Sequence, residues 1–309
     1  MRGVDGVVVA LGNFDGVHLG HRAVIRRALE IGREGGRRVV AATFDPHPRA
    51  VIRPGGEPWL LSTPETRREL LLDLGVDEVR VIRFDAELSR KSPEEFVEDV
   101  LVGELGASDV VVGENFRFGY KASGGVEELA ETLRRSGGEA HPVPIRGVES
   151  GEEEISSSRI RALLGEGDAA GAARLLGRPY AVRGEVVEGD RRGRTIGFPT
   201  ANLAPDPRLL VPARGVYAGY AELLERERRR YGACTNVGVA PTFERQENRV
   251  EAHLLDFDGD LYGQTVEVGF TERLRPEQKF SGLEELKAQI SRDAARARSL
   301  GGWGSSGAP

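Results

Sequence analysis

Short apolar runs alternate with amphipathic stretches through the first half of the chain. The longest amphipathic stretch predicts a helix from about His18 to Ile31, between two apolar runs. Parallel strands need helical crossovers, and strands buried on both faces are apolar throughout, so this alternation predicts a doubly wound parallel sheet. Ligands of such sheets bind at the carboxyl ends of the strands. The expected strands are Val7–Leu11, Val39–Phe44, Val79–Phe84, Val110–Val112 and His141–Ile145.

Capping signals place the starts of further helices in this half. Thr63 can cap a helix whose first residue is Pro64, and that helix should stop by Gly75. Ser92 and Glu95 form a Ser-x-x-Glu capping box, in which each side chain satisfies a backbone N–H of the other residue. Further helices are expected from about residue 126 to 135 and from about residue 156 onward.

The pattern changes near Tyr180 to short runs separated by Gly, Pro and Asp, which predicts an antiparallel barrel or sandwich. A helix opened by the capping box of Ser281 and Glu284 should close this half. We therefore expect domains over 1–176 and 177–300 and a disordered tail over 301–309. The expected strands are Val182–Val187, Val216–Leu223, Tyr231–Val237, Val250–Phe257 and Val266–Phe270.

Composition narrows the function classes. The 309 residues suit two domains of about 150 residues each. With 43 basic and 49 acidic residues the net charge is −6, which argues against binding to nucleic acid or an anionic membrane. Cys234 is alone, so an intramolecular disulfide or a cysteine-clustered metal site is excluded, and we expect a cytoplasmic protein. The run Val7–Leu11 is too short for a signal peptide or a membrane span.

The segment after the first predicted strand carries candidate phosphate chemistry. His18 and His21 lie three residues apart at the start of a helix and so share one face. Gly16 and Gly20 allow close approach of backbone N–H groups, and the helix N-terminus attracts anions. The two imidazoles could therefore donate hydrogen bonds to an α-phosphate whose charge grows during displacement.

Residues 12–21, Gly-Asn-Phe-Asp-Gly-Val-His-Leu-Gly-His, resemble the FMN adenylyltransferase module of bacterial bifunctional riboflavin kinase/FAD synthetases, which are HxGH-type nucleotidyltransferases. Matching segments follow in order at 43–48, 112–119 and 155–161. Ser158 departs from the usual Thr but keeps the hydroxyl, and residues 120–124 lack an expected Arg. For His47, between two prolines, a rigid turn and a substrate contact remain open.

The resemblance implies roles for individual residues of this module. His18 and His21 would be catalytic, and Asn115 and Phe116 would bind flavin or help to place the adenine. The ATP- and phosphate-binding residues would be Gly12, Phe14, Asp15, Gly16, Gly20, Ser156, Ser157 and Arg159.

A second motif at 184–203 resembles the glycine-rich loop and Pro-Thr-Ala-Asn motif of riboflavin kinase. The Thr200 hydroxyl and the Asn202 amide oxygen are hard ligands suited to Mg²⁺. Glu251 matches the proposed general base, which must lie within hydrogen-bond reach of the attacking hydroxyl. The ATP-binding residues implied here are Gly189, Arg194 and Gly197.

Together the two resemblances imply that a C-terminal β-barrel phosphorylates riboflavin with ATP and Mg²⁺, and that the N-terminal domain then converts FMN and ATP to FAD and pyrophosphate. Apo-flavoproteins could receive the FAD. One alternative is another cytidylyl- or adenylyltransferase, in which the barrel only positions substrate. A second is a flavin-binding or regulatory protein that has lost catalysis. The retained His18, His21, Thr200, Asn202 and Glu251 argue against this second alternative.

Overall fold

The computed structural model describes residues 6–144, 155–189, 193, 196–225, 228–241 and 246–301, without the side chains of 239–248. Arg194 and most of the expected tail, 302–309, lie outside these ranges. The chain forms two compact units, 1–157 and 158–309.

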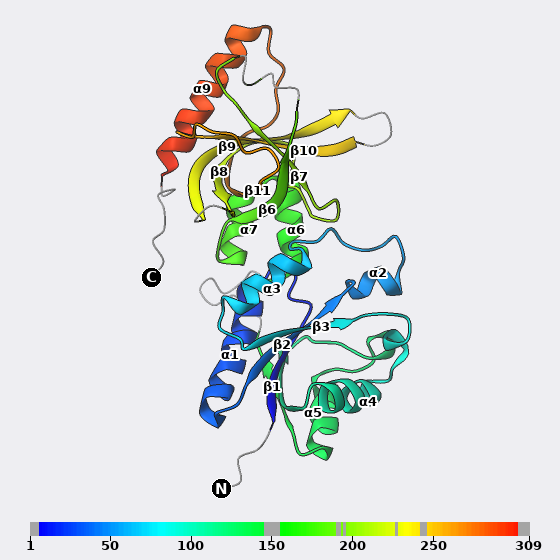
Figure 1. Cartoon of the computed structure of the whole chain (residues 1–309). Helices are drawn as coiled ribbons and strands as arrows, with labels where there is room; N and C mark the ends of the chain where they lie inside the picture. The colour runs from blue at the N-terminus through cyan, green and yellow to red at the C-terminus, as the bar shows by residue number, and fades with distance from the viewer. Residues whose placement is uncertain are drawn as a thin grey trace. The chain divides into compact units, whose positions relative to one another are not determined.

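The first unit is built on a five-stranded parallel sheet in the order β3-β2-β1-β4-β5 (Figure 1). This confirms the doubly wound sheet expected from the apolar runs, with β1 at its centre and β3 and β5 as its outer strands. The strands are β1 (Val7–Leu11), β2 (Val39–Asp45), β3 (Glu78–Arg83), β4 (Ala107–Gly113) and β5 (Glu139–Val143).

Both faces of the sheet are covered, which explains the unbroken apolar runs. Val8 and Ala10 of β1 pack in one core with α1 (Leu19–Gly35). Val9 and Leu11 pack in a second core on the opposite face, formed with two helices, η2 (Phe96–Glu104) and α5 (Val126–Arg135). The other helices described in the unit are α2 (Pro48–Ile52), α3 (Pro64–Leu72), η1 (Leu88–Arg90), α4 (Pro93–Glu95) and η3 (Tyr120–Ala122).

The expected caps are formed. The Thr63 hydroxyl accepts from the Thr66 N–H ahead of Pro64, and Ser92 and Glu95 make the reciprocal capping box. The helix after Ser92 continues from α4 into the π-helical η2, a change of helix type that the capping motif does not encode.

The second unit combines helices with a closed six-stranded antiparallel barrel in the order β10-β7-β6-β11-β8-β9. The sequence pattern left barrel and sandwich open, and it missed β7, which contains the Ala201-Asn202 pair of the Pro-Thr-Ala-Asn motif. The elements are α6 (Ser157–Glu166), α7 (Ala169–Leu176), β6 (Tyr180–Val187), β7 (Ala201–Pro205), β8 (Gly215–Leu223), β9 (Arg229–Pro241), β10 (Gln246–Leu254), β11 (Thr265–Arg275) and α9 (Leu283–Leu300).

Helix α9 packs on the barrel wall, where Ala294 and Ala297 share a core cluster with Val216 and Ala218 of β8. Its start differs from the expected capping box. Gly282 is the N-cap, and the Ser281 backbone N–H and hydroxyl both donate to Glu285 rather than to Glu284, at 2.8 and 2.7 Å.

Helices α6 and α7 follow the first unit in sequence, and the pattern of runs placed the boundary after residue 176. Their contacts group them with the barrel, because the Ala213 N–H donates to the Leu164 carbonyl at 2.9 Å and the Arg273 guanidinium donates to the Glu166 carbonyl at 3.4 Å. Among the helices that the structure describes, none has the length and apolarity needed to cross a bilayer.

Candidate active sites

The loop between β1 and α1 makes a tight turn at the carboxyl edge of the sheet. Phe14, Gly16 and Val17 have φ values of 49°, 81° and 42°, a left-handed conformation that costs about 1–3 kcal/mol at a non-glycine residue. The turn ends at His18, which is the N-cap of α1. The loop therefore delivers the side chain of His18 to the positive end of the helix.

His18 and His21 lie together, as their spacing predicts. Their rings stack with centroids 3.5 Å apart, and the rings of His21 and Phe14 are nearly perpendicular, with centroids 5.3 Å apart. The His21 backbone N–H donates to Nδ1 of His18 at 3.3 Å, so a neutral His18 carries its proton on Nε2. His18 is only 3% exposed, which fixes its ring, and the arrangement places two imidazoles beside the first amides of α1.

Asp15 has a different environment from the one expected of a phosphate-binding residue. It is 1% exposed, and its carboxylate accepts from the backbone N–H groups of Leu61 and Ser62 at 3.0 Å. Arg67, which is also buried, lies 3.5 Å from the same carboxylate. The side chain therefore holds the β1–α1 loop against residues 61–62.

Ser157 connects the Ser156–Arg159 segment to this loop. Its hydroxyl donates to the Asp15 carbonyl at 2.9 Å, across 142 positions of sequence. Arg159 follows on α6, where its side chain is exposed.

The expected flavin-binding residues follow β4. Asn115 is exposed, and Phe116 is half-buried with its ring stacked on Phe118 at 5.6 Å between centroids. Arg117 donates to the carbonyls of Ala122 and Ser123 and so closes the loop in which the family's Arg is missing. His47 caps α2 by accepting from the Arg49 N–H at 3.2 Å, which supports the rigid-turn interpretation of this residue.

A cavity of about 420 Å³ is lined both by barrel residues, including Thr200, Asn202 and Glu251, and by residues of α9 such as Leu286 and Ile290. Strand pairing brings these residues together, because Glu251 of β10 pairs with Asn202 of β7 on one side and with Asn236 of β9 on the other. Three residues that the sequence assigned to one reaction thus share one cavity.

The glycine-rich loop lies against the same cavity. A Cβ at Gly189 would lie 2.4–2.7 Å from the Asn202 side chain, so only glycine allows this approach. Gly193 lines the cavity, and Gly197 has φ 89°.

Arg249 is a cavity residue that the sequence reasoning missed. Its Nε lies 2.7 Å from Glu251 Oε1, and its Nε and Nη2 donate to Asn202 Oδ1 at 3.2 and 3.1 Å. Residues 249 and 251 are two apart on one strand and so face the same side. This alternation is the signal that could have placed Arg249 beside Glu251.

Other lining residues were also missed. Arg275 pairs with Asp293 at 2.8 Å and so connects β11 to α9, and Nδ1 of His253 lies 2.8 Å from the Pro199 carbonyl. Cys234 lines the cavity too, but burial, with a smaller effect of Asp293, raises the pKa of its thiol to about 12. Cys234 therefore stays protonated at neutral pH and is a poor nucleophile.

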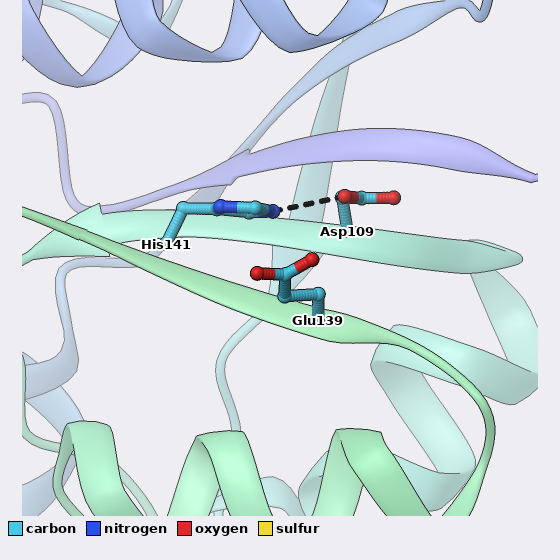
Figure 2. A group of neighbouring side chains, drawn as sticks. All are labelled: Asp109, Glu139 and His141. Atoms are coloured by element: carbon cyan, nitrogen blue, oxygen red, sulfur yellow. Dashed lines mark hydrogen bonds and ion pairs between the residues drawn. The ribbon is translucent and has the colours of Figure 1, made fainter. Parts of the chain in front are cut away.

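Asp109, Glu139 and His141 form a third polar cluster, near the amino ends of β4 and β5 (Figure 2). Nε2 of His141 lies 2.9 Å from Asp109 Oδ1, while Arg37 and Ser108 donate to Asp109 Oδ2. The carboxylate of Asp109 is thus already paired with a cation, so we assign this cluster to the stability of the sheet.

Comparison with known proteins also divides the chain into two parts. The FAD synthetase family model matches residues 3–159, and the riboflavin kinase model matches residues 176–300. Helices α6 and α7 thus lie largely between the two matches.

Two curated relatives are described as bifunctional riboflavin kinase/FMN adenylyltransferases, and each is 37% identical to this chain. The Bacillus subtilis (strain 168) protein matches over 94% of this chain and 91% of its own length, and the Escherichia coli (strain K12) protein over 96% and 94%. A crystal structure described as a macrolide-efflux protein from Streptococcus pneumoniae has 34% identity and a TM-score of 0.86, covering 96% of this chain and 94% of that one.

Proposed function

Because the chain belongs to the family of bifunctional riboflavin kinase/FMN adenylyltransferases, we propose that its two units carry out successive steps of flavin cofactor synthesis. The barrel transfers the γ-phosphoryl group of ATP to the terminal ribityl hydroxyl of riboflavin, giving FMN and ADP. The first unit joins FMN to the AMP part of a second ATP, giving FAD and pyrophosphate. FMN leaves one site and enters the other.

The shared barrel cavity is the observation that carries the kinase assignment. Glu251 accepts the proton of the ribityl hydroxyl as the hydroxyl oxygen attacks the γ-phosphorus. Its place on β10, between Asn202 and Asn236, holds the carboxylate at the cavity wall. The backbone near Gly189 and Gly197 approaches the ATP phosphates without obstruction by a Cβ.

The oxygen donors in this cavity fit Mg²⁺, which prefers hydroxyl, amide and carboxylate oxygens. Thr200 and Asn202 would hold the ion. When bound, it would neutralise charge on the ATP oxygens.

In the first unit, His18 and His21 stabilise the α-phosphate as an FMN phosphate oxygen attacks it and pyrophosphate leaves. Both imidazoles lie at the N-terminus of α1, where the amides and the helix dipole favour the same negative charge. Asp15 acts as a positioning residue, because its carboxylate fixes the loop that carries His18. The FMN phosphate oxygen forms its bond to the α-phosphorus as the bond from that phosphorus to pyrophosphate breaks, so the step needs no covalent enzyme intermediate.

Ser156, Ser157 and Arg159 would hold the triphosphate, and Asn115 and Phe116 would place the flavin or adenine. Delivery of FAD to apo-flavoproteins and a cytoplasmic location remain predictions of the sequence.

Paired substitutions test the assignment. Glu251→Gln should reduce FMN formation from riboflavin at least about 100-fold and leave conversion of supplied FMN to FAD unchanged, because general bases contribute about 10²–10⁴-fold. His21→Ala should do the reverse. Chromatography of reactions with riboflavin or FMN, ATP and Mg²⁺ measures both activities, and each variant serves as the control for the other.

Loss of both activities in both folded variants would contradict independent sites. The same assay separates the alternatives. Turnover of another phosphorylated acceptor without a kinase step would favour a different nucleotidyltransferase, and flavin binding without ATP consumption would favour a protein that has lost catalysis.

A further inference from the structure

The position proposed for the divalent cation in the barrel is already in contact with a positive side chain. The guanidinium of Arg249 bridges Asn202 Oδ1 and Glu251 Oε1, with Nε 3.2 Å from the first oxygen and 2.7 Å from the second. Both oxygens belong to residues with proposed roles in phosphoryl transfer. A guanidinium carries a single charge, whereas Mg²⁺ carries two and needs the same kind of oxygen.

The contact between Arg249 and Glu251 is partly shielded from solvent. The Arg249 side chain is 27% exposed and that of Glu251 is 24% exposed, so the pair loses much of the screening of bulk water. Asn202 cannot turn freely away from the guanidinium, because Gly189 lies against its side chain and the β7–β10 pairing fixes its backbone. The bridge is therefore set by the fold of the barrel.

We propose that Arg249 is a positioning residue that takes the place of the divalent cation in the nucleotide-free kinase site. It holds Asn202 and Glu251 in place and weakens binding of a metal ion that arrives without ATP. When metal and ATP arrive together, the guanidinium moves from Asn202 to the phosphates, which it can bind through two parallel N–H groups. This inference rests on the kinase function proposed above and assigns a role beyond it.

If the Arg249 guanidinium competes with the metal ion, removing Arg249 should have opposite effects on the binding of free metal and of the metal–ATP complex. Removal of Arg249 should strengthen metal binding in the absence of nucleotide, because a competing charge leaves and Glu251 loses its partner. The same removal should weaken productive binding of the metal–ATP complex, because the phosphates lose a donor. A residue that only supported the fold would weaken both.

The test compares full-length wild type with Arg249→Met and Arg249→Lys. Mn²⁺ serves as the probe, and its binding to nucleotide-free protein is followed by electron paramagnetic resonance. Arg249→Met should bind Mn²⁺ about 10-fold more tightly than wild type, and its KM for Mg–ATP should rise about 10-fold. Arg249→Lys keeps the charge and should stay within about 3-fold of wild type in Mn²⁺ affinity.

Thr200→Val tests whether the measured Mn²⁺ binds at the proposed metal site in the kinase cavity. Added to Arg249→Met, it should abolish the gain in Mn²⁺ affinity, because it removes a proposed metal ligand. Equal or weaker Mn²⁺ binding by Arg249→Met than by wild type would overturn the proposal, as would a gain that survives Thr200→Val.

Folding and function are checked separately. Conversion of FMN to FAD does not use the barrel cavity and should be unchanged in all these variants. If the Met variant does not fold, Arg249→Lys still tests the proposal, because a large change in its Mn²⁺ affinity would contradict a role of the charge. Absence of riboflavin phosphorylation by wild type would overturn the kinase function itself, whereas the Mn²⁺ comparison does not depend on turnover.

Discussion

Asp15 and Glu251 show how the surroundings of a carboxylate decide its role. Both occur in motifs that the sequence assigns to nucleotide chemistry. Asp15 is surrounded by backbone N–H groups and Arg67, all of which it contacts inside the first unit. Glu251 faces a cavity large enough for a substrate. A motif suggests that a residue lies near the chemistry, and its burial and partners then indicate whether it is better suited to contact a ligand or to support the loop that carries it.

At the scale of residues, the sequence predicted which side chains lie together when both belong to one short segment. His18 and His21 lie on one turn of helix, so their spacing was sufficient to place them together. Arg249 was missed because its partner Asn202 is 47 positions away, and only the register of β7 and β10 brings them together. A single sequence does not specify strand register at that distance.

Asp109 should make the stability of the first unit depend on acidity. Burial raises the pKa of its carboxyl, but the hydrogen bonds from His141 and Ser108 and the charge of Arg37 outweigh burial, so the folded-state pKa lies below the ordinary value of 3.8. A group with a lowered folded-state pKa stabilises the protein above its unfolded pKa. This contribution is lost as the pH falls below 3.8 toward the folded-state value.

Asp109→Asn should therefore lower the free energy of unfolding by about 1–3 kcal/mol at pH 7, because buried partners lose a charged acceptor. The difference from wild type should shrink below pH 4. Urea unfolding followed across this range measures it, with Glu139→Gln at the exposed neighbour as the matched control. A difference that is the same at pH 3 and pH 7 would contradict this account of the cluster.

At the scale of elements, periodicity predicted the parallel sheet and most barrel strands, and local caps predicted the starts of α3 and α4. Strand β7 was missed because Pro199 and Thr200 precede it and suggest a turn. Its buried residues Ala201 and Leu203 do alternate with Asn202, which is a weak strand signal. The apolar pattern does not distinguish the π-helical geometry of η2 from an α-helix, since both bury one face against the sheet.

The approach of the loop after β6 to strand β7 gives a prediction at this scale. Gly189→Ala would place a methyl group 2.4–2.7 Å from the Asn202 side chain, so Asn202 must move. Riboflavin phosphorylation should fall at least about 10-fold, because a small misplacement of a binding group near the chemistry can cost about 10²-fold. FAD formation from supplied FMN should not change.

Steady-state kinetics with each flavin substrate measures this effect. The matched control is Gly263→Ala, where a Cβ would meet no atom within 4 Å although the φ of 73° is strained. If both alanine variants lose kinase activity equally, general strain in the barrel, and not the contact with Asn202, is the cause.

At the scale of the whole molecule, each unit has its own core. Leu133 has no exposed surface and packs against one face of the parallel sheet. Val268, on β11 of the barrel, is also fully buried. We expect the units to unfold in separate transitions. Leu133→Ala should cost about 2–5 kcal/mol and lower the melting temperature of one transition by at least about 5 °C.

Differential scanning calorimetry of Leu133→Ala and Val268→Ala measures this separation. Each substitution should move a different transition, and FAD formation should be the activity lost first on heating the Leu133 variant. A single transition that both substitutions shift equally would show that the units unfold together.

The arrangement of strands also affects how readily the protein aggregates at high concentration. Every strand of the closed barrel has two neighbours, whereas the parallel sheet of the first unit has two outer strands, each with one side open. One margin is β3, where Arg80 and Arg83 are exposed, and the other is β5, where Pro142 has no N–H to offer. An incoming strand would meet charge at one margin and a missing donor at the other. The outer strands therefore oppose the edge-to-edge growth that leads to amyloid-like aggregates.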